Sequence, residues 1–145
     1  MSNNTPDYND NLAFQPKKTT GTIETINADN KPVAIRCYVD DKHYFDLALY
    51  DAPETMDWYD AKCWCEKNYC RLPMKHEWEF VIANIKRINK MLEKAGGDLL
   101  NKSYWSSSEY TGNYAWYSNF SSSYGLDWGN KNYGCYLYVR PVLAL

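Results

Sequence analysis

The sequence has no long apolar run. No stretch approaches the roughly 20 consecutive apolar residues that a membrane-spanning helix needs, and residues 1–20 contain no apolar segment typical of a secretory signal. We therefore expect no membrane span, and a location in a phage particle, in the cytoplasm or, after processing, at a surface. Residues 1–20 are polar and aperiodic, which predicts a flexible arm before a single domain over 21–145.

Excess charge and histidine are also scarce. The formal net charge is −2 and the pI is about 5.7, so simple electrostatics gives no support to nucleic-acid binding. Only two histidines occur, His43 and His76. We expect each to be a surface or turn residue rather than a catalytic one.

The cysteines lack a metal-binding or disulfide pattern. There are five of them, and an odd number leaves at least one thiol free or paired between chains. Cys63, Cys65 and Cys70 are close in sequence, but they include no CxxC pair, and the first two would face different sides of a helix. A structural zinc site is therefore weakly supported, and we expect buried or unreactive thiols.

Alternating apolar residues predict a β-hairpin early in the domain. The alternation runs over 33–39 and again over 45–49, with a turn at 40–42 between them. A helix over 56–68 follows, with Thr55 as its N-cap and with three residues on its buried face, Trp58, Ala61 and Cys65.

A second, longer helix is predicted over 74–94, ending at Gly96-Gly97. Its apolar stripe comprises Trp78, Val81, Ile82, Ile85, Ile88 and Leu92. After Leu100 the helical pattern stops, and short apolar pairs separated by Ser, Asn and Gly predict short strands joined by loops. Pro141 restricts the closing strand to an edge or a bulge, because proline has no amide hydrogen to donate.

These elements predict an α+β domain, with two helices packed on a small mixed or antiparallel sheet and a loop-rich C-terminal β region. Strand alternation would bury about half of the tail aromatics. The tail residues that we assign to the core are Trp105, Trp116, Phe120 and Leu137.

Aromatic residues are abundant, at 17% of the chain. Eight of 14 tyrosines and three of six tryptophans lie in residues 101–145, whereas only Glu109, Asp127 and Lys131 are charged between positions 103 and 138. Tyrosine offers a large rigid contact area, and Ser, Gly and Asn supply adaptable hydrogen bonds, as in antibody paratopes. The tail composition predicts a recognition surface for a protein or a glycan, with ordinary solvated loops as the alternative.

Two segments resemble the two-helix signature of bacterial C-type-lectin-like domains, a superfamily that includes the formylglycine-generating enzymes: Trp58-Tyr-Asp-Ala-Lys-Cys-Trp-Cys65 and Arg71-Leu-Pro-Met-Lys-His-Glu-Trp78. The tail more closely resembles variable proteins that retroelements diversify in gut bacteria and their phages. The likeness spans about residues 30–145 and is carried in the tail by Tyr104–Tyr110, Ala115-Trp116, Asn119-Phe120 and Val139–Val142.

The resemblance implies a C-type lectin-like fold whose residues 104–140 form a variable, ligand-binding region, rewritten by error-prone copying at adenines. Trp128 does not fit an origin in the usual AAY codons. The resemblance implies no catalytic residue, metal or cofactor, and it implies an unknown protein or glycan ligand on a cell surface, with an oligomer or a larger assembly possible. The candidate ligand-binding residues are Asn113, Tyr114, Tyr117, Asn119, Ser121, Ser123, Tyr124, Asp127, Trp128, Asn130, Asn132, Tyr133, Cys135, Tyr136 and Tyr138.

Other functions stay open. A structural subunit of a fimbria or phage tail would use residues 1–20 as its attachment arm. A formylglycine-generating enzyme acts through cysteines of its C-terminal core, where this chain has only Cys135. A calcium-dependent lectin needs Glu-Pro-Asn and Trp-Asn-Asp triplets, which this chain lacks.

We expect two polar features of the tail to have structural rather than catalytic roles. We expect Glu109 to bond to the backbone or to Arg140. We expect the hydroxyls of residues 106–108 to satisfy turns or neighbouring backbone, because the sequence places no base that could activate a serine.

Overall fold

The computed structural model describes residues 21–121, 125–132 and 134–145, and these form an α+β fold with three helices and two antiparallel sheets. The arm expected over residues 1–20 lies outside the described residues. The five-stranded sheet has the order β1-β2-β3-β8-β4 and the three-stranded sheet the order β5-β6-β7. The strands are β1 (Ile23–Ala28), β2 (Lys31–Tyr38), β3 (Tyr44–Ala48), β4 (Cys70–Arg71), β5 (Ser103–Thr111), β6 (Tyr114–Asn119), β7 (Gly125–Asn130) and β8 (Val142–Leu143).

The predicted hairpin is confirmed as β2 and β3, which pair with Ile35 opposite Leu47. Its turn is held by Asp40, whose Oδ1 accepts the backbone N–H groups of Lys42 and His43, each at 2.8 Å. The sequence did not lead us to predict β1, which pairs antiparallel with β2.

The turn between β1 and β2 consists of Asp29 and Asn30, both at positive φ. Positive φ at both central residues is the requirement of the tight hairpin turn that matches strand twist, and Asn and Asp tolerate it best after glycine. This dipeptide was the local signal for the strand that was missed.

The closing strand β8 lies inside the five-stranded sheet, between β3 and β4. The prediction that Pro141 would confine this strand to an edge or a bulge is therefore wrong. Pro141 immediately precedes β8, so the missing amide hydrogen costs no ladder bond, and its carbonyl accepts the N–H of Ala48 at 2.9 Å.

Helix α1 (Trp58–Lys67) buries Trp58, Ala61 and Cys65, as predicted. Its N-cap is Asp57 rather than Thr55: the Asp57 carboxylate accepts the N–H of Asp60 at 2.9 Å. Aspartate stabilises a helix start both by this bond and by its charge at the positive end of the helix dipole.

The single long helix predicted over 74–94 is wrong, because the chain forms α2 (Lys75–Ala83) and α3 (Ile85–Ala95) with a break at Asn84. The Asn84 side-chain amide donates to the carbonyl of Phe80 at 2.8 Å and competes with the helical backbone for it. The apolar stripe continues across the break, and Gly96 ends α3 in the left-handed conformation, as expected.

Two clusters of buried side chains form the core. The larger packs α2 and α3 against the five-stranded sheet, and the smaller joins α1 to β5, β6 and the segment around Val139. Trp105 and Phe120 are buried as predicted, and Leu137 is partly buried against the smaller cluster. The assignment of Trp116 to the core is wrong: it is only partly buried and belongs to neither cluster.

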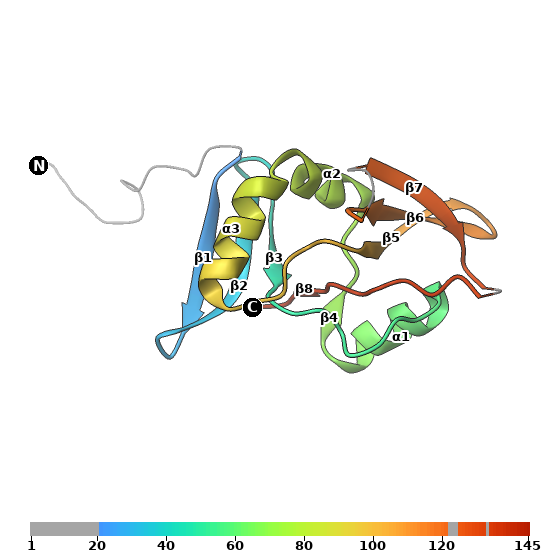
Figure 1. Ribbon diagram of the computed structural model, residues 1–145, viewed down its shortest axis with the longest axis horizontal. Helices are drawn as coiled ribbons and strands as arrows, with labels where there is room; N and C mark the ends of the chain where they lie inside the picture. The colour runs from blue at the N-terminus through green and yellow to red at the C-terminus, as the bar shows by residue number, and fades with distance from the viewer. Residues whose placement is uncertain (1–20, 122–124, 133) are drawn as a thin grey trace, which may run out of the picture.

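The sheet β5–β7 lies at the opposite end of the molecule from the hairpin β1–β2, with α3 in front of the larger sheet (Figure 1). It is more regular than the loop-rich region expected from the sequence. Within the described part of the chain, no helix has both the length and the apolar character needed to cross a membrane.

Candidate functional site

The sheet β5–β7 carries a group of packed aromatic side chains, Tyr110, Trp116 and Trp128, here called the aromatic cluster. Trp116 of β6 is directly opposite Trp128 of β7, and Tyr110 comes from the end of β5. The Tyr110 and Trp128 rings are stacked with centroids 4.6 Å apart and 14° between their planes, while Trp116 meets Trp128 edge-on at 5.6 Å. Tyr110 and Trp128 are each 46% exposed, so the cluster is a surface feature.

One cation adjoins this cluster. The Lys75 ammonium lies 4.3 Å from the Trp116 ring centroid, within the range of a cation–π interaction. Its own backbone N–H donates to Ser108 Oγ at 2.9 Å, which ties the start of α2 to β5. The cluster thus combines exposed apolar ring surface with a positive charge supplied by a different element.

Seven of the residues predicted to bind ligand are exposed: Asn113, Tyr114, Ser121, Asp127, Trp128, Asn132 and Tyr136. Five more are partly buried: Tyr117, Asn119, Asn130, Cys135 and Tyr138. Ser123, Tyr124 and Tyr133 lie outside the described residues.

The predicted residues do not share one face of the sheet. Register places Trp116, Trp128 and Asn130 on one face, whereas Tyr117 and Asp127, which pair with each other, lie on the opposite face. The aromatic cluster belongs to the first face.

Two of the predicted tyrosines lie outside strands β5–β7, although Tyr138 forms a parallel bridge with Tyr104 of β5. Tyr138 packs against Tyr104 at 6.2 Å and receives the Lys102 ammonium over its ring at 4.5 Å, beside the larger core cluster. Tyr136 is 60% exposed and lines a groove of about 530 Å³ between α1 and residues 53–56. The single surface predicted from the sequence is therefore divided among separate places.

The second face is closely packed near Gly129. A Cβ atom at this position would lie 2.9 Å from Cys135 Sγ and 3.4 Å from the rings of Trp105 and Tyr117, so a larger residue requires a shift of its neighbours. Burial raises the pKa of Tyr117, and the nearby charge of Asp127 raises it further. This face supports the smaller core cluster more than it offers an open surface.

Glu109 pairs with Lys131 rather than with Arg140, which corrects the prediction from the sequence. Lys131 Nζ donates to Glu109 Oε1 at 2.6 Å and to the carbonyl of Gly112 at 3.0 Å, and it lies 4.5 Å from the Trp58 ring centroid. The bond from Lys131 lowers the pKa of Glu109. Lys131 therefore ties the β5–β6 turn to α1.

The hydroxyls of residues 106 and 108 satisfy neighbouring backbone, as predicted. Ser106 Oγ donates to the carbonyl of Trp116 at 2.7 Å and accepts the N–H of Ser108 at 3.1 Å. Ser108 Oγ accepts the N–H of Lys75 at 2.9 Å, so the hydroxyls of Ser106 and Ser108 both serve as structural hydrogen-bonding groups.

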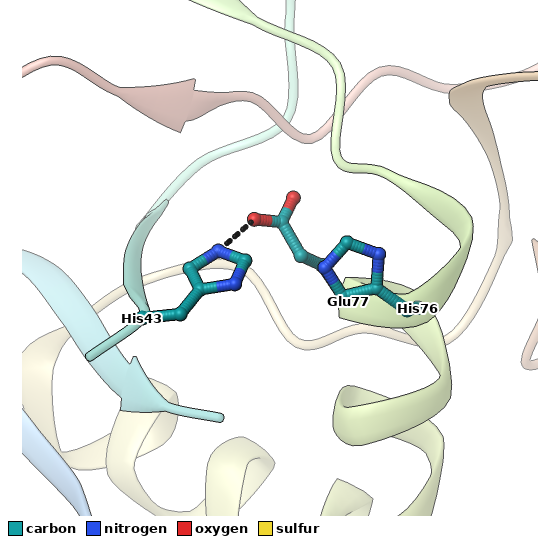
Figure 2. A group of neighbouring side chains, drawn as sticks. All are labelled: His43, His76 and Glu77. Atoms are coloured by element: carbon teal, nitrogen blue, oxygen red, sulfur yellow. Dashed lines mark hydrogen bonds and ion pairs between the residues drawn. The ribbon is translucent and has the colours of Figure 1, made fainter. Parts of the chain in front are cut away.

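A polar cluster lies where the β2–β3 turn meets the start of α2, and it comprises His43, His76 and Glu77 (Figure 2). His43 Nε2 lies 3.2 Å from Glu77 Oε2, and the two imidazole centroids are 5.3 Å apart. The sequence reading treated the two histidines separately and gave no reason to place them together.

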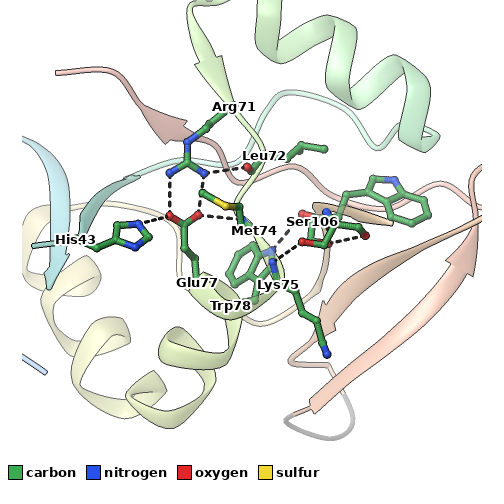
Figure 3. A network of polar contacts seen from close by, with 10 residues as sticks. His43, Arg71, Leu72, Met74, Lys75, Glu77, Trp78 and Ser106 are labelled. Atoms are coloured by element: carbon green, nitrogen blue, oxygen red, sulfur yellow. Dashed lines mark hydrogen bonds and ion pairs between the residues drawn. The ribbon is translucent and has the colours of Figure 1, made fainter. Parts of the chain in front are cut away.

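Glu77 is fully buried and strongly hydrogen-bonded (Figure 3). Its two carboxylate oxygens accept a bidentate pair of bonds from Arg71, each at 2.8 Å, and Oε1 also accepts the N–H of Met74 at 2.8 Å. Burial alone would raise the pKa of Glu77, but the bonds from Arg71, Met74 and His43 outweigh it and hold this pKa below 4.5.

Sequence reasoning missed Tyr110, Trp116 and Lys75 as surface residues of the candidate site. Tyr110 lies two residues before the Gly112-Asn113 turn, which indicates a strand end, but nothing local predicts its stacking on Trp128. Lys75 comes from a helix outside the tail region, so only the tertiary structure brings it to Trp116.

No protein-family model matches the chain, and no curated protein matches it in sequence.

Proposed function

We propose that this is a ligand-binding protein of the receptor or adhesion type and that its binding surface is centred on the aromatic cluster. The observation that carries the proposal is the exposure of Tyr110 and Trp128, each at 46%, on a sheet whose other face packs against the core. Tyrosine and tryptophan are the residues most enriched at interface hot spots.

The cluster has the physical properties of a preorganised binding site. Tyr110, Trp116 and Trp128 contact one another, so their side chains lose little further rotamer freedom when a ligand covers them. Charged side chains are few, and Glu109 is already paired with Lys131, which limits the cost of removing ions from water on binding.

The raised pKa of Cys135 favours a binding function over catalysis of the formylglycine-generating type. A nucleophilic cysteine needs a lowered pKa, because the thiolate is the reactive form. Burial instead raises the pKa of Cys135, the one cysteine of the C-terminal region.

We further propose a C-type lectin-like fold and diversification of residues 104–140 by a retroelement. The α+β architecture is compatible with that fold, and the exposed and partly buried candidate positions are interspersed with buried residues such as Ala115, Ser118 and Phe120. Substitution at the exposed positions would therefore alter the surface and spare the core. The test is the flanking DNA: a reverse-transcriptase gene and a near-copy of this coding segment that differs only at adenines are expected, and their absence would contradict diversification.

Binding is tested with an array of immobilised glycans and a panel of intact bacterial cells as probes. Trp128→Ala and Tyr110→Ala should each weaken whatever binding the wild type has by tenfold or more. Tyr50→Ala is the matched control, because Tyr50 is an exposed aromatic residue outside the three-stranded sheet. Binding that survives both variants, or that is lost equally in the control, would contradict this placement of the site.

A further inference from the structure

We propose that His43, His76 and Glu77 form a binding site for one divalent transition-metal ion of the zinc class. The site lies between the β2–β3 turn and the start of α2 and is separate from the aromatic cluster, so this inference does not rest on the proposed function. It departs from the expectation, drawn from the sequence, that the chain binds no metal.

The three side chains present their ligand atoms to one another. Among the residues that the structure describes, they form the one group of three potential ligands, with atoms all within 4.8 Å of each other. Two imidazole nitrogens and one carboxylate are a donor set that zinc-class ions favour, and such three-ligand sites leave a position for water. Figure 2 shows His43 reaching the carboxylate from the turn, with His76 beside it on α2.

The contact between His43 and Glu77 has the spacing that a shared ion requires. Nε2 and Oε2 are 3.2 Å apart, and each atom carries a lone pair unless the nitrogen holds a proton. A positive centre must therefore lie between them, either a proton or a metal ion. An ion bonded to both at about 2.0–2.2 Å with a tetrahedral angle would separate them by about 3.3–3.5 Å, which is close to the observed distance.

The remaining contacts leave this position open. Arg71 and the Met74 N–H use the other lone pairs of the Glu77 carboxylate, so Arg71 stays bound and holds the carboxylate in place, as outer-shell partners do at metal sites. His76 is exposed on the first turn of α2 and can turn toward the ion. The positive charge of Arg71 opposes a cation, so we expect weaker binding than at a closed four-ligand zinc site.

The test is calorimetric titration of the full-length, untagged chain with Zn²⁺. We expect one ion per chain, with affinity reduced at least tenfold in His76→Ala and in His43→Ala. No other imidazole can compete for the ion, because the chain has no histidine besides these two. Circular dichroism and thermal melting identify any variant that fails to fold, and His76→Ala, which changes an exposed side chain, keeps the test decisive if His43→Ala does fail.

Two control variants distinguish binding at this site from binding at an exposed thiol or at another carboxylate. Cys63→Ser removes the one exposed thiol, and Glu79→Gln removes an exposed carboxylate of α2; both should leave binding unchanged. With Co²⁺ as the probe, the spectrum should lack the intense sulfur-to-metal band of thiolate ligation. The proposal is overturned if the wild type binds no ion, if binding survives loss of either histidine, or if it disappears in Cys63→Ser.

Discussion

Arg140 donates from Nε to Oδ1 of Asp51 at 2.9 Å, across 89 positions of the sequence. The guanidinium is fully buried and also donates to the backbone carbonyls of Ala48 at 3.2 Å and Asp98 at 2.7 Å. One side chain therefore joins the end of β3, the segment after α3 and the closing segment of the chain. Removing it would leave Oδ1 of Asp51 and two carbonyls without this donor, while Lys102, whose Nζ lies 3.3 Å from Oδ2, would still pair with the carboxylate.

We expect Arg140→Ala to lower the free energy of unfolding by about 3–5 kcal/mol, because it removes the buried partner of Asp51 and leaves two carbonyls without their donor. Arg87→Ala is the control: Arg87 is exposed, and its loss should cost less than about 1 kcal/mol. Urea unfolding measures both. Equal losses in the two variants would contradict the central role assigned to Arg140.

The ion pair of Lys131 and Glu109 is asymmetric, since the side chain of Lys131 is 3% exposed and that of Glu109 is 58% exposed. Lys131→Met keeps the apolar stem but removes both hydrogen bonds and the charge over Trp58, and it should lower stability by about 1.5–3 kcal/mol. Glu109→Gln should cost much less, because water can solvate the exposed end of the pair. Thermal melting compares them, and a larger loss in Glu109→Gln would refute the asymmetry.

Glu77 should make the stability of the protein sensitive to acid. Its pKa is lowered in the folded state, so its contribution is fully present above the ordinary value of 4.5 and is lost as the pH falls through the lower folded-state value. Glu77→Gln should be less stable than the wild type at neutral pH, and this difference should shrink as the pH falls below 4.5.

Unfolding free energies measured between neutral pH and the acid limb test this expectation. Glu79→Gln, an exposed change on the same helix, should follow the wild-type curve. A difference between Glu77→Gln and wild type that stays constant with pH would show that the carboxylate does not contribute in this way.

The five free thiols should react at very different rates. Cys63 is exposed, whereas burial raises the pKa of Cys37 to about 12 and also raises that of Cys65, which keeps both in the unreactive thiol form. A disulfide reagent should modify Cys63 first in the native protein, and Cys37 and Cys65 only on unfolding. The fast phase should vanish in Cys63→Ser and remain in Cys135→Ser; a fast phase that persists without Cys63 would contradict the assignment.

The candidate site was only partly predictable. Tyr114 and Trp128 are exposed, as the composition of the tail suggested, because tyrosine among Ser, Asn and Gly is typical of surfaces. Trp116 was placed in the core, because alternation tells which residues share a face but not which face is covered. Which face is covered depends on how α2 packs against the sheet, and α2, which carries Lys75, lies outside the tail.

Local periodicity was enough to predict the hairpin of β2 and β3, the buried face of α1, and the apolar stripe of α2 and α3. Neighbours a few positions apart decide these, because side chains repeat every two residues in strands and every 3.6 in helices. The interior place of β8 and the pairs Asp51–Arg140 and Glu109–Lys131 could not be predicted in this way. Each of these depends on which distant backbone groups and charges become buried together, and that information lies in the packing of the elements rather than in any local pattern.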